Sequence, residues 1–285
     1  MSTLRILRRR IRSIQNTQQI TKAMEMVAAA KLRKAQARAQ AARPYSVKIT
    51  EMLANLAAAA GELEDPLFKA REVKRTALVV VTADRGLSGA YNSNLIRAAE
   101  QRLRAAAPGS IHLVILGRKG RDYFKRRKYP VLATYTPVPG VASIEFAREL
   151  TQDLIARYLK GEVDRVEILF TQYISALRRN LVTEVFLPVG TERPQDAPRG
   201  GDPIFEPDAE TIFAELLPRY ATAKLFAALA DALASQYSAQ MIAMGAARKN
   251  AGELIERLVL QRNRLRQAAI TKELLDIVGG AEALK

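Results

Sequence analysis

The sequence contains no cysteine, and its only histidine is His112. Without cysteine the chain can form no disulfide framework, no thiolate zinc site and no cysteine nucleophile, and one histidine cannot build a histidine metal cluster. No uninterrupted apolar run approaches the roughly 18 residues that a membrane-spanning helix needs. These absences exclude disulfide-stapled domains and zinc fingers, and they predict that the chain does not cross a membrane by itself.

Positive charge is concentrated at one end of the chain. The 285 residues carry a formal net charge of +16. Residues 1–50 hold twelve Lys or Arg and one acidic residue, Glu25, so they account for +11 of it. Such a field favours an anionic partner: a nucleic acid, an anionic lipid surface or an acidic protein surface.

The stretch from Asp208 to the C-terminus is predicted to be one very long helix. Asp208 supplies a helix start, Pro218 is a possible break, and no proline follows it. At the helical rise, the part after Pro218 would span roughly 100 Å, so it needs a partner along its length. Its predicted contact stripe is Ala223, Ala227, Ala230, Ala234, Tyr237, Met241, Met244, Ala251, Leu254, Leu258, Leu265, Ala268 and Leu275.

The N-terminal stretch carries the strict 3-4 spacing of a left-handed coiled coil. We predict that it pairs with the C-terminal helix, and antiparallel, because the chain between them must return. Pro44 is expected to kink or end this helix, with a second piece from Ile49 to Ala60 capped by Gly61. The predicted seam is Leu4, Leu7, Ile11, Ile14, Gln18, Thr21, Glu25, Ala28, Leu32, Ala35, Ala39 and Ala42.

Both terminal helices offer apolar residues outside their seams. Ile20, Met24 and Val27 form a second stripe near the N-terminus, and Ile270, Leu274 and Ile277 form another near the C-terminus. Helices that are apolar on several sides are normally enclosed, so a surrounding partner is one interpretation. A coiled coil with a local shift of register is the other.

The middle of the chain alternates strands with helices. Strands are predicted at 77–82, 111–116, 131–135, 166–171 and 182–187, and helices at 92–107, 119–127 and 143–159. This order favours a mostly parallel sheet covered on both faces, with the last two strands as an antiparallel edge hairpin.

The predicted fold class is therefore α/β: a long antiparallel coiled coil of the terminal helices with an inserted Rossmann-like domain. We expect four segments: an N-terminal coiled-coil helix (1–60), an α/β foot domain (75–190), a proline-containing linker (191–207) and a C-terminal coiled-coil helix (208–285). A long rod on a compact head is typical of a lever, spacer or shaft.

The loop after the first predicted strand could bind a phosphate. Gly86 and Gly89 follow the first strand and precede a helix, where backbone amides can approach a phosphate, but neither dinucleotide nor P-loop spacing is present. A tight turn is the simpler interpretation, and Ser88 lies in no hydrolase elbow.

The basic runs 31–34 and 262–266 could bind nucleic-acid phosphates, although they lack interleaved aromatic residues for stacking. A solvated face of the coiled coil is the common interpretation of such runs, and nucleic-acid binding remains the alternative function.

Three segments carry a resemblance to a known family. Residues 14–29, 82–92 and 266–281 resemble, in order, the N-terminal, central and C-terminal signatures of the gamma subunit of F-type ATP synthases. The resemblance implies a central rotor shaft standing in a ring of three alpha and three beta subunits. It places the foot on the epsilon subunit and the membrane-embedded c-ring, and couples c-ring rotation to ATP synthesis or hydrolysis.

The resemblance also implies what this chain does not do. It predicts no catalytic residue, no cofactor, no metal and no nucleic acid, because the nucleotide sites would lie in the surrounding ring. Residues 191–207 contain no cysteine pair, which argues against a redox-switched chloroplast version. The expected location is the cytoplasmic side of the plasma membrane, peripherally, within the complex.

The stripes, the charges and the resemblance together suggest a partner interface. The basic members would meet acidic loops of beta subunits, and the apolar members would slide against an apolar collar. The predicted interface residues are Lys22, Met24, Glu25, Met26, Val27, Lys31, Arg33, Gln267, Ile270, Thr271, Leu274 and Ile277.

Overall fold

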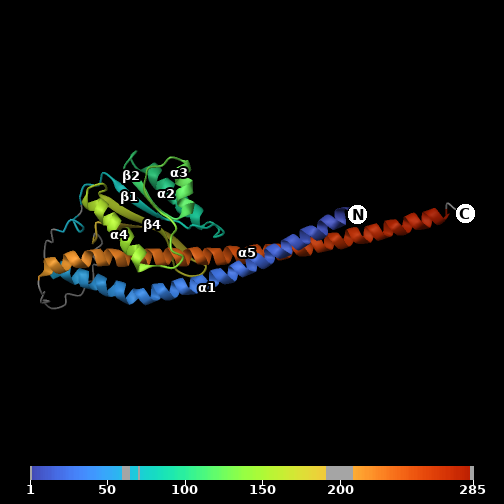
Figure 1. Ribbon diagram of the computed structural model, residues 1–285, viewed down its shortest axis with the longest axis horizontal. Coiled ribbons are helices and arrows are strands. Elements are labelled where there is room, and N and C mark those ends of the chain that lie inside the picture. The colour runs from blue at the N-terminus through green and yellow to red at the C-terminus, as the bar shows by residue number, and fades with distance from the viewer. Residues whose placement is uncertain (1, 60–64, 70, 191–207, 283–285) are drawn as a thin grey trace. The chain divides into compact units, whose positions relative to one another are not determined.

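Two helices are far longer than any other described helix or strand. The computed structural model describes residues 2–59, 65–69, 71–190 and 208–282. Helix α1 runs from Ser2 to Ala59 and helix α5 from Ala209 to Glu282 (Figure 1). The chain divides into two compact units, Met1–Ala28 with Met241–Lys285, and Ala29–Gln240. Each long helix therefore contributes one segment to each unit.

The second unit is built on a five-stranded sheet. The strand order is β3-β2-β1-β4-β5, with every pair parallel except β4 and β5. This arrangement confirms the predicted mostly parallel sheet with an antiparallel edge hairpin. The elements are β1 (Thr76–Val81), α2 (Tyr91–Ala105), β2 (Ile111–Leu116), α3 (Arg118–Arg126), β3 (Val131–Tyr135), α4 (Ile144–Leu159), β4 (Arg165–Tyr173) and β5 (Arg179–Leu187).

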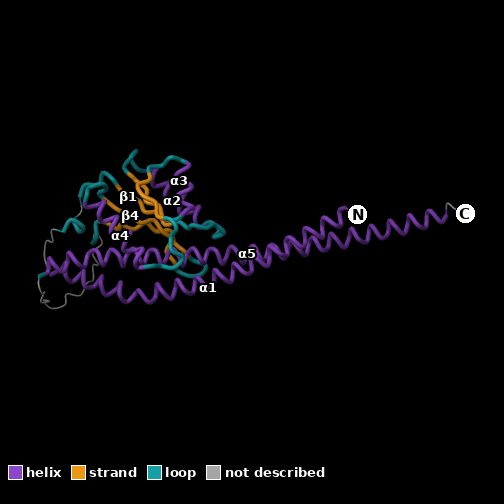
Figure 2. Tube along the Cα trace, in the orientation of Figure 1, coloured by secondary structure: helices purple, strands orange, loops and turns teal. Residues whose placement is uncertain are grey.

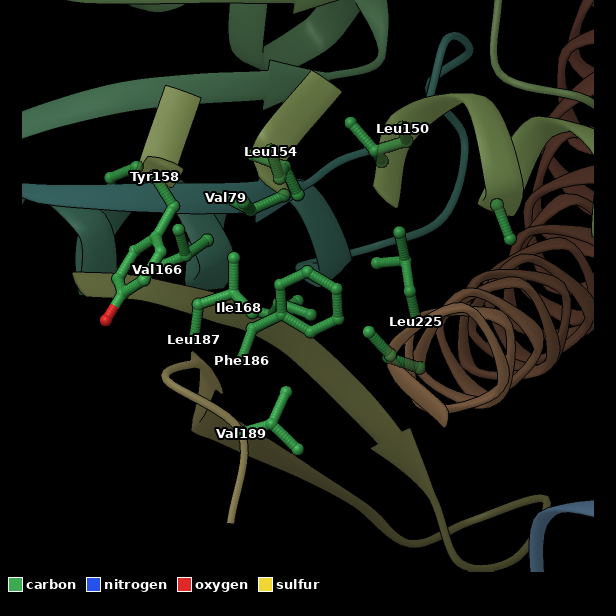
Figure 3. Packing of buried hydrophobic residues seen from close by; sticks show 14 of the residues in the cluster. Val79, Leu150, Leu154, Tyr158, Val166, Ile168, Phe186, Leu187, Val189 and Leu225 are labelled. Atoms are coloured by element: carbon green, nitrogen blue, oxygen red, sulfur yellow. The ribbon is translucent and has the colours of Figure 1, made fainter. Parts of the chain in front are cut away.

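Both faces of this sheet are covered by helices. Val79 points to the face covered by α4 and α5, where it shares a core with Leu154 and Leu225 (Figure 3). Its neighbours Leu78 and Val80 point to the opposite face and pack with α2 and α3. Successive strand residues alternate between faces, so this apolar run fills two cores at once. The sheet thereby holds α5 directly against one of its faces.

The first unit is an antiparallel pair of helical segments. Leu7 and Ile11 of α1 are buried against Leu258 of α5. Further along the same pair, Glu25 of α1 contacts Arg248 of α5, so the two helices run in opposite directions. Every member of the predicted N-terminal seam, from Leu4 to Ala42, is buried or half-buried. The antiparallel pairing and the N-terminal seam are thus confirmed.

The predicted stripe on α5 was partly wrong. Ala227, Leu254, Ala268 and Leu275 are exposed. In the first unit, the seam positions of α5 keep a 3-4 spacing, but two of them are arginines, which a search for apolar residues skips, and one of these, Arg248, is exposed although it pairs with Glu25. The seam positions are Met241, Met244, Arg248, Ala251, Ile255, Leu258, Arg262, Leu265 and Ala269.

Two prolines were expected to interrupt the helices, and neither ends one. Pro44 lies inside α1 and Pro218 inside α5. Each proline removes the donor for the carbonyl four residues earlier, on Gln40 and Ala214, and both of these residues are exposed. Water can donate hydrogen bonds to those exposed carbonyls. Packing of the residues on either side of each proline keeps the helix continuous. The predicted Gly61 cap and the linker 191–207 lie outside the described residues.

Candidate functional site

The glycine-containing loop after β1 is a tight, internally bonded turn. The Asp84 carboxylate accepts hydrogen bonds from the backbone amides of Arg118 at 3.0 Å and Val138 at 2.8 Å. Asn92 Oδ1 accepts from the Ala83 amide at 2.9 Å. The polar side chains of this loop thus fasten the ends of neighbouring strands to one another. This geometry favours the tight turn over a phosphate site.

The described residues offer little metal or acid–base chemistry. Among them, no group of three or more His, Asp or Glu residues could hold a metal ion. His112 is half-buried within β2. Burial raises the pKa of Tyr91, whose hydroxyl donates to the carbonyls of Val81 and Ala232 at 3.2 and 3.3 Å. Tyr91 therefore has structural partners, whereas the buried Nδ1 of His112 has no hydrogen-bond partner among the described residues.

One carboxyl group of the second unit has an unusual environment. Asp231 of α5 lines a cavity of about 290 Å³ together with Glu184 of β5 and Lys224 of α5. Burial first, and the negative charge of Glu184 second, raise the pKa of Asp231 to about 6. The Lys224 ammonium donates to the Val185 carbonyl at 2.8 Å. The site therefore responds to pH through one side chain.

No helix in the described ranges is both long enough and apolar enough to cross a membrane.

Exposed apolar side chains lie on more than one side of α1 in the first unit. Ile6, Ile20, Met26 and Val27 are each between 54% and 62% exposed. Lys22 is exposed among them and Met24 is half-buried beside the seam. Ile6 was missed at the sequence level because its neighbour Leu7 already filled the seam position. The pair of α1 and α5 therefore leaves apolar surface that no described residue covers.

The end of α5 extends past the start of α1 (Figure 1). Every described side chain from Thr271 to Val278 is exposed. Ile270, Leu274 and Ile277 are 50%, 57% and 68% exposed, and their spacing of four and three puts them on one stripe. Gln267 is also exposed, and its carbonyl accepts from Thr271 Oγ1 at 3.0 Å. We call residues 270–278 the overhang; Leu275 and Val278 belong to it and were not among the predicted interface residues.

The basic members of the predicted interface differ in their surroundings. Lys22 and Arg33 are exposed. Lys31, in the second unit, holds its ammonium 5.4 Å from the centre of the Tyr237 ring. Glu25 turns into the seam and pairs with Arg248 at 2.9 Å. The predicted set is therefore not one patch of equivalent side chains.

Distance along the helices also divides the predicted set. Glu25 lies opposite Arg248, and Gln267 lies 19 residues further along α5, which is about 30 Å at the helical rise. The structure thus brings residues 22–27 together and residues 267–277 together, but it does not join the two groups. A partner that contacts both must extend along the coiled coil.

Comparisons with known proteins identify the family of such a chain. The profile of a family described as ATP synthase matches residues 3–284. The chain is 48% identical over 285 residues to the ATP synthase gamma chain of Moorella thermoacetica, with both chains fully covered. Two cryo-EM structures of mitochondrial ATP synthases share its fold. The Euglena gracilis rotor has a TM-score of 0.68 and 19% identity, covering 94% of this chain and 99% of that one. The Tetrahymena thermophila central stalk and c-ring structure has a TM-score of 0.62 and 21% identity, covering 80% and 99%.

Proposed function

Because the chain belongs to the ATP synthase gamma chain family, we propose that it is the central rotor shaft of an F-type ATP synthase. In this role it couples rotation of a proton-driven c-ring to ATP synthesis or hydrolysis in a ring of three alpha and three beta subunits. The single observation that carries the mechanism is the overhang. A two-helix rod that ends in one exposed helix is asymmetric about its axis, so each turn presents a different side to a surrounding ring.

The exposed side chains fit a contact that must slide. Ile270, Leu274 and Ile277 make no directional bonds, so an apolar collar can pass over them without breaking hydrogen bonds. Lys22 and Arg33 stand in solvent, where ion pairs are individually weak and screened by salt. Contacts that are individually weak and easily replaced suit a rotating interface better than one strong, specific contact.

The proposed partner surface keeps all twelve predicted residues, with roles set by their surroundings. The overhang, which includes Thr271, and its neighbour Gln267 face the upper part of the alpha and beta ring. Met26 and Val27 face the ring from α1, with Met24 and Glu25 at the border of the seam. Lys22, Lys31 and Arg33 meet acidic loops of the beta subunits. The α/β domain docks on the epsilon subunit and the c-ring.

The chain itself performs no catalysis in this proposal, and it binds no cofactor. The nucleotide sites lie in the surrounding ring, and the chain reaches the membrane only through the complex, on the cytoplasmic side of the plasma membrane. The internally bonded loop after β1 supports this division of labour, because its polar side chains are already used.

Co-expression with the alpha and beta subunits tests the proposal. We expect a complex of about three alpha, three beta and one copy of this chain, with ATP hydrolysis by the complex and none by the isolated chain. The nucleic-acid alternative predicts gel shifts that weaken steeply with salt and no such complex. Brisk ATP hydrolysis by the isolated chain, or failure to enter the ring, would contradict the shaft.

A further inference from the structure

The loop between β3 and α4 contacts both long helices of the second unit. Arg38 Nη1 of α1 donates to the Ala142 carbonyl at 2.7 Å. Tyr237 Oη of α5 donates to the Gly140 carbonyl at 2.5 Å. Figure 2 shows loops of this domain, in teal, running alongside the purple helices. One short loop therefore ties α1 and α5 to the same end of the sheet.

The hairpin between β4 and β5 repeats this arrangement. Gln36 Nε2 of α1 donates to the Tyr173 hydroxyl at 2.6 Å. Ser238 Oγ of α5 donates to the Ala176 carbonyl at 2.5 Å, and Arg179 donates to Ser238 Oγ at 3.4 Å. Two separate loops thus hold the same short segment of each helix, residues 36–38 and 237–238.

These polar contacts lie where the helices leave the second unit. The apolar core of that unit holds α5 mainly over residues 213–232 and α1 at Leu53 and Leu56. The hydrogen-bonded segment of α5 comes later, two residues before the unit ends at Gln240. The loops therefore hold each helix by hydrogen bonds near the boundary of the unit, beside the buried Leu32 and Ala35 of α1 and the buried Ala239 of α5.

The apolar contacts beside the loops resist rotation of a helix about its own axis less specifically than hydrogen bonds do. The buried residues of α5 just before the loops alternate small alanines, such as Ala230 and Ala234, with the larger Leu229 and Leu233. Dispersion contacts are non-directional, whereas a hydrogen bond weakens steeply once its angle is lost. The directional bonds therefore add to the resistance that packing of the leucines provides.

Burial strengthens the bonds made by α5, whereas Arg38 of α1 is exposed. Ser238 is fully buried and Tyr237 is only 4% exposed. Water therefore cannot readily replace a broken bond, and a buried polar group left without a partner is costly. The Tyr237 ring is also covered by the Lys31 ammonium, which gives α1 and α5 a direct contact at the same level.

We propose that loops 136–143 and 174–178 form a torque clamp, in which Arg38, Tyr237 and Ser238 prevent the two helices from turning against the α/β domain. The clamp transmits torque between the domain and the rod. This inference rests on the proposed rotor function and names the positioning residues that the function requires.

The test compares two matched triple variants in complete ATP synthase reconstituted into liposomes. The clamp variant is Arg38→Met, Tyr237→Phe and Ser238→Ala. The control variant is Arg121→Met, Tyr129→Phe and Ser110→Ala, which removes hydrogen bonds made within the α/β domain. ATP hydrolysis is measured with an uncoupler present, and proton pumping is measured as the gradient reached without it.

We expect the clamp variant to hydrolyse ATP at the wild-type rate, within about twofold, when the uncoupler removes the load. Under load it should slip: the four lost hydrogen bonds raise the rate of uncoupled turning by about tenfold or more, and the gradient falls accordingly. The control variant should match wild type in both measurements. A clamp variant that builds the wild-type gradient at the wild-type hydrolysis rate would overturn the inference.

A single substitution protects the test against misfolding. Tyr237→Phe keeps the ring and loses only the bond to Gly140, so it should assemble normally and slip to a smaller degree. If the single variant and the control variant pump equally well, the clamp is refuted even if the triple variant fails to assemble. If wild-type complexes neither assemble nor rotate, it is the rotor function, and not the clamp, that has failed.

Discussion

Arg248 of α5 donates through Nε to the Glu25 carboxylate of α1 at 2.9 Å, across the seam of the antiparallel pair. Both residues hold positions that apolar side chains occupy elsewhere in the same seam. Gly245 and Gly252 lie on the same side of α5, where added Cβ atoms would meet Glu25 and Gln18. The first unit therefore contains a polar layer with glycines that make room for its side chains.

Replacing this ion pair with leucines should stabilise the first unit. Part-exposed pairs contribute about 0–1 kcal/mol, whereas two packed leucines remove apolar surface from water and should raise the free energy of unfolding by about 1–2 kcal/mol. The double variant Glu25→Leu with Arg248→Leu is measured by urea unfolding of the full chain, followed by circular dichroism. Arg248→Leu alone, which leaves Glu25 without its partner, is the comparison and should fall below the double variant. A double variant less stable than wild type would mean that the pair stabilises the helices more than packing does.

Filling one of the glycine positions should also stabilise the rod. A Cβ at Gly245 would lie 3.2 Å from Glu25 Oε1, which is the end of a flexible side chain and can move aside. Alanine favours a helix over glycine by about 1 kcal/mol, so Gly245→Ala should gain about 0.5–1 kcal/mol in urea unfolding.

Gly117→Ala is the opposite control. Gly117 has φ +90°, and an added Cβ would lie 2.3 Å from the Thr82 carbonyl oxygen. This substitution should cost about 2 kcal/mol or more, because neither the backbone conformation nor the neighbouring backbone can yield cheaply. If both glycine substitutions destabilised the chain equally, the flexible neighbour at Gly245 would not be free to move.

The two ends of the chain differed in how well sequence predicted them. The α1 seam was predictable because its 3-4 spacing persists even through Gln18, Thr21 and Glu25, and all three turn out to be buried or half-buried. On α5 the same spacing passes through Arg248 and Arg262. A search for apolar residues therefore assigned Leu254 to the seam in place of its neighbour Ile255. Such a polar seam position becomes recognisable only when its partner is known.

The two prolines illustrate a second limit. The cost of each proline to its helix is visible in the sequence. The packing that offsets this cost is made by buried residues near each proline, such as Ile49 after Pro44 and Leu217 before Pro218, with segments that are distant in the sequence. The candidate interface shows the same limit. Its exposed stripes and the seam position of Glu25 could be predicted from spacing, whereas the ion pair between Glu25 and Arg248 joins residues more than 200 positions apart and could not.

Stability of the second unit should fall as pH rises through the titration of Asp231. Its pKa is raised from 3.8 to about 6, so the folded chain holds this proton more tightly than the unfolded chain. The resulting stabilisation is complete below about pH 4 and is lost by about pH 6. After allowing for partial solvent screening, Asp231→Asn should exceed wild type by about 1–2 kcal/mol at pH 8 and equal it near pH 4.

Urea unfolding at pH 4, 6 and 8 measures this difference. Glu149→Gln on α4 is the matched control, because it removes an exposed negative charge without touching the cavity. Its difference from wild type should not follow the same pH dependence. A pH-independent gain for Asp231→Asn would show that the carboxyl is not destabilised by its surroundings.

The overhang should matter to the complex and not to the isolated chain. Replacing Ile270, Leu274 and Ile277 with serine alters side chains that are half-exposed or more, so the free energy of unfolding should change by less than about 0.5 kcal/mol per residue. In the assembled complex these residues are proposed to bear on an apolar collar, and the triple variant should lower the torque measured in single-molecule rotation. Ile255→Ser, in the buried seam, supplies the contrast: it should destabilise the isolated chain by about 2 kcal/mol or more. Wild-type torque from the triple variant would remove the overhang from the proposed interface, while leaving the family and the antiparallel rod unaffected.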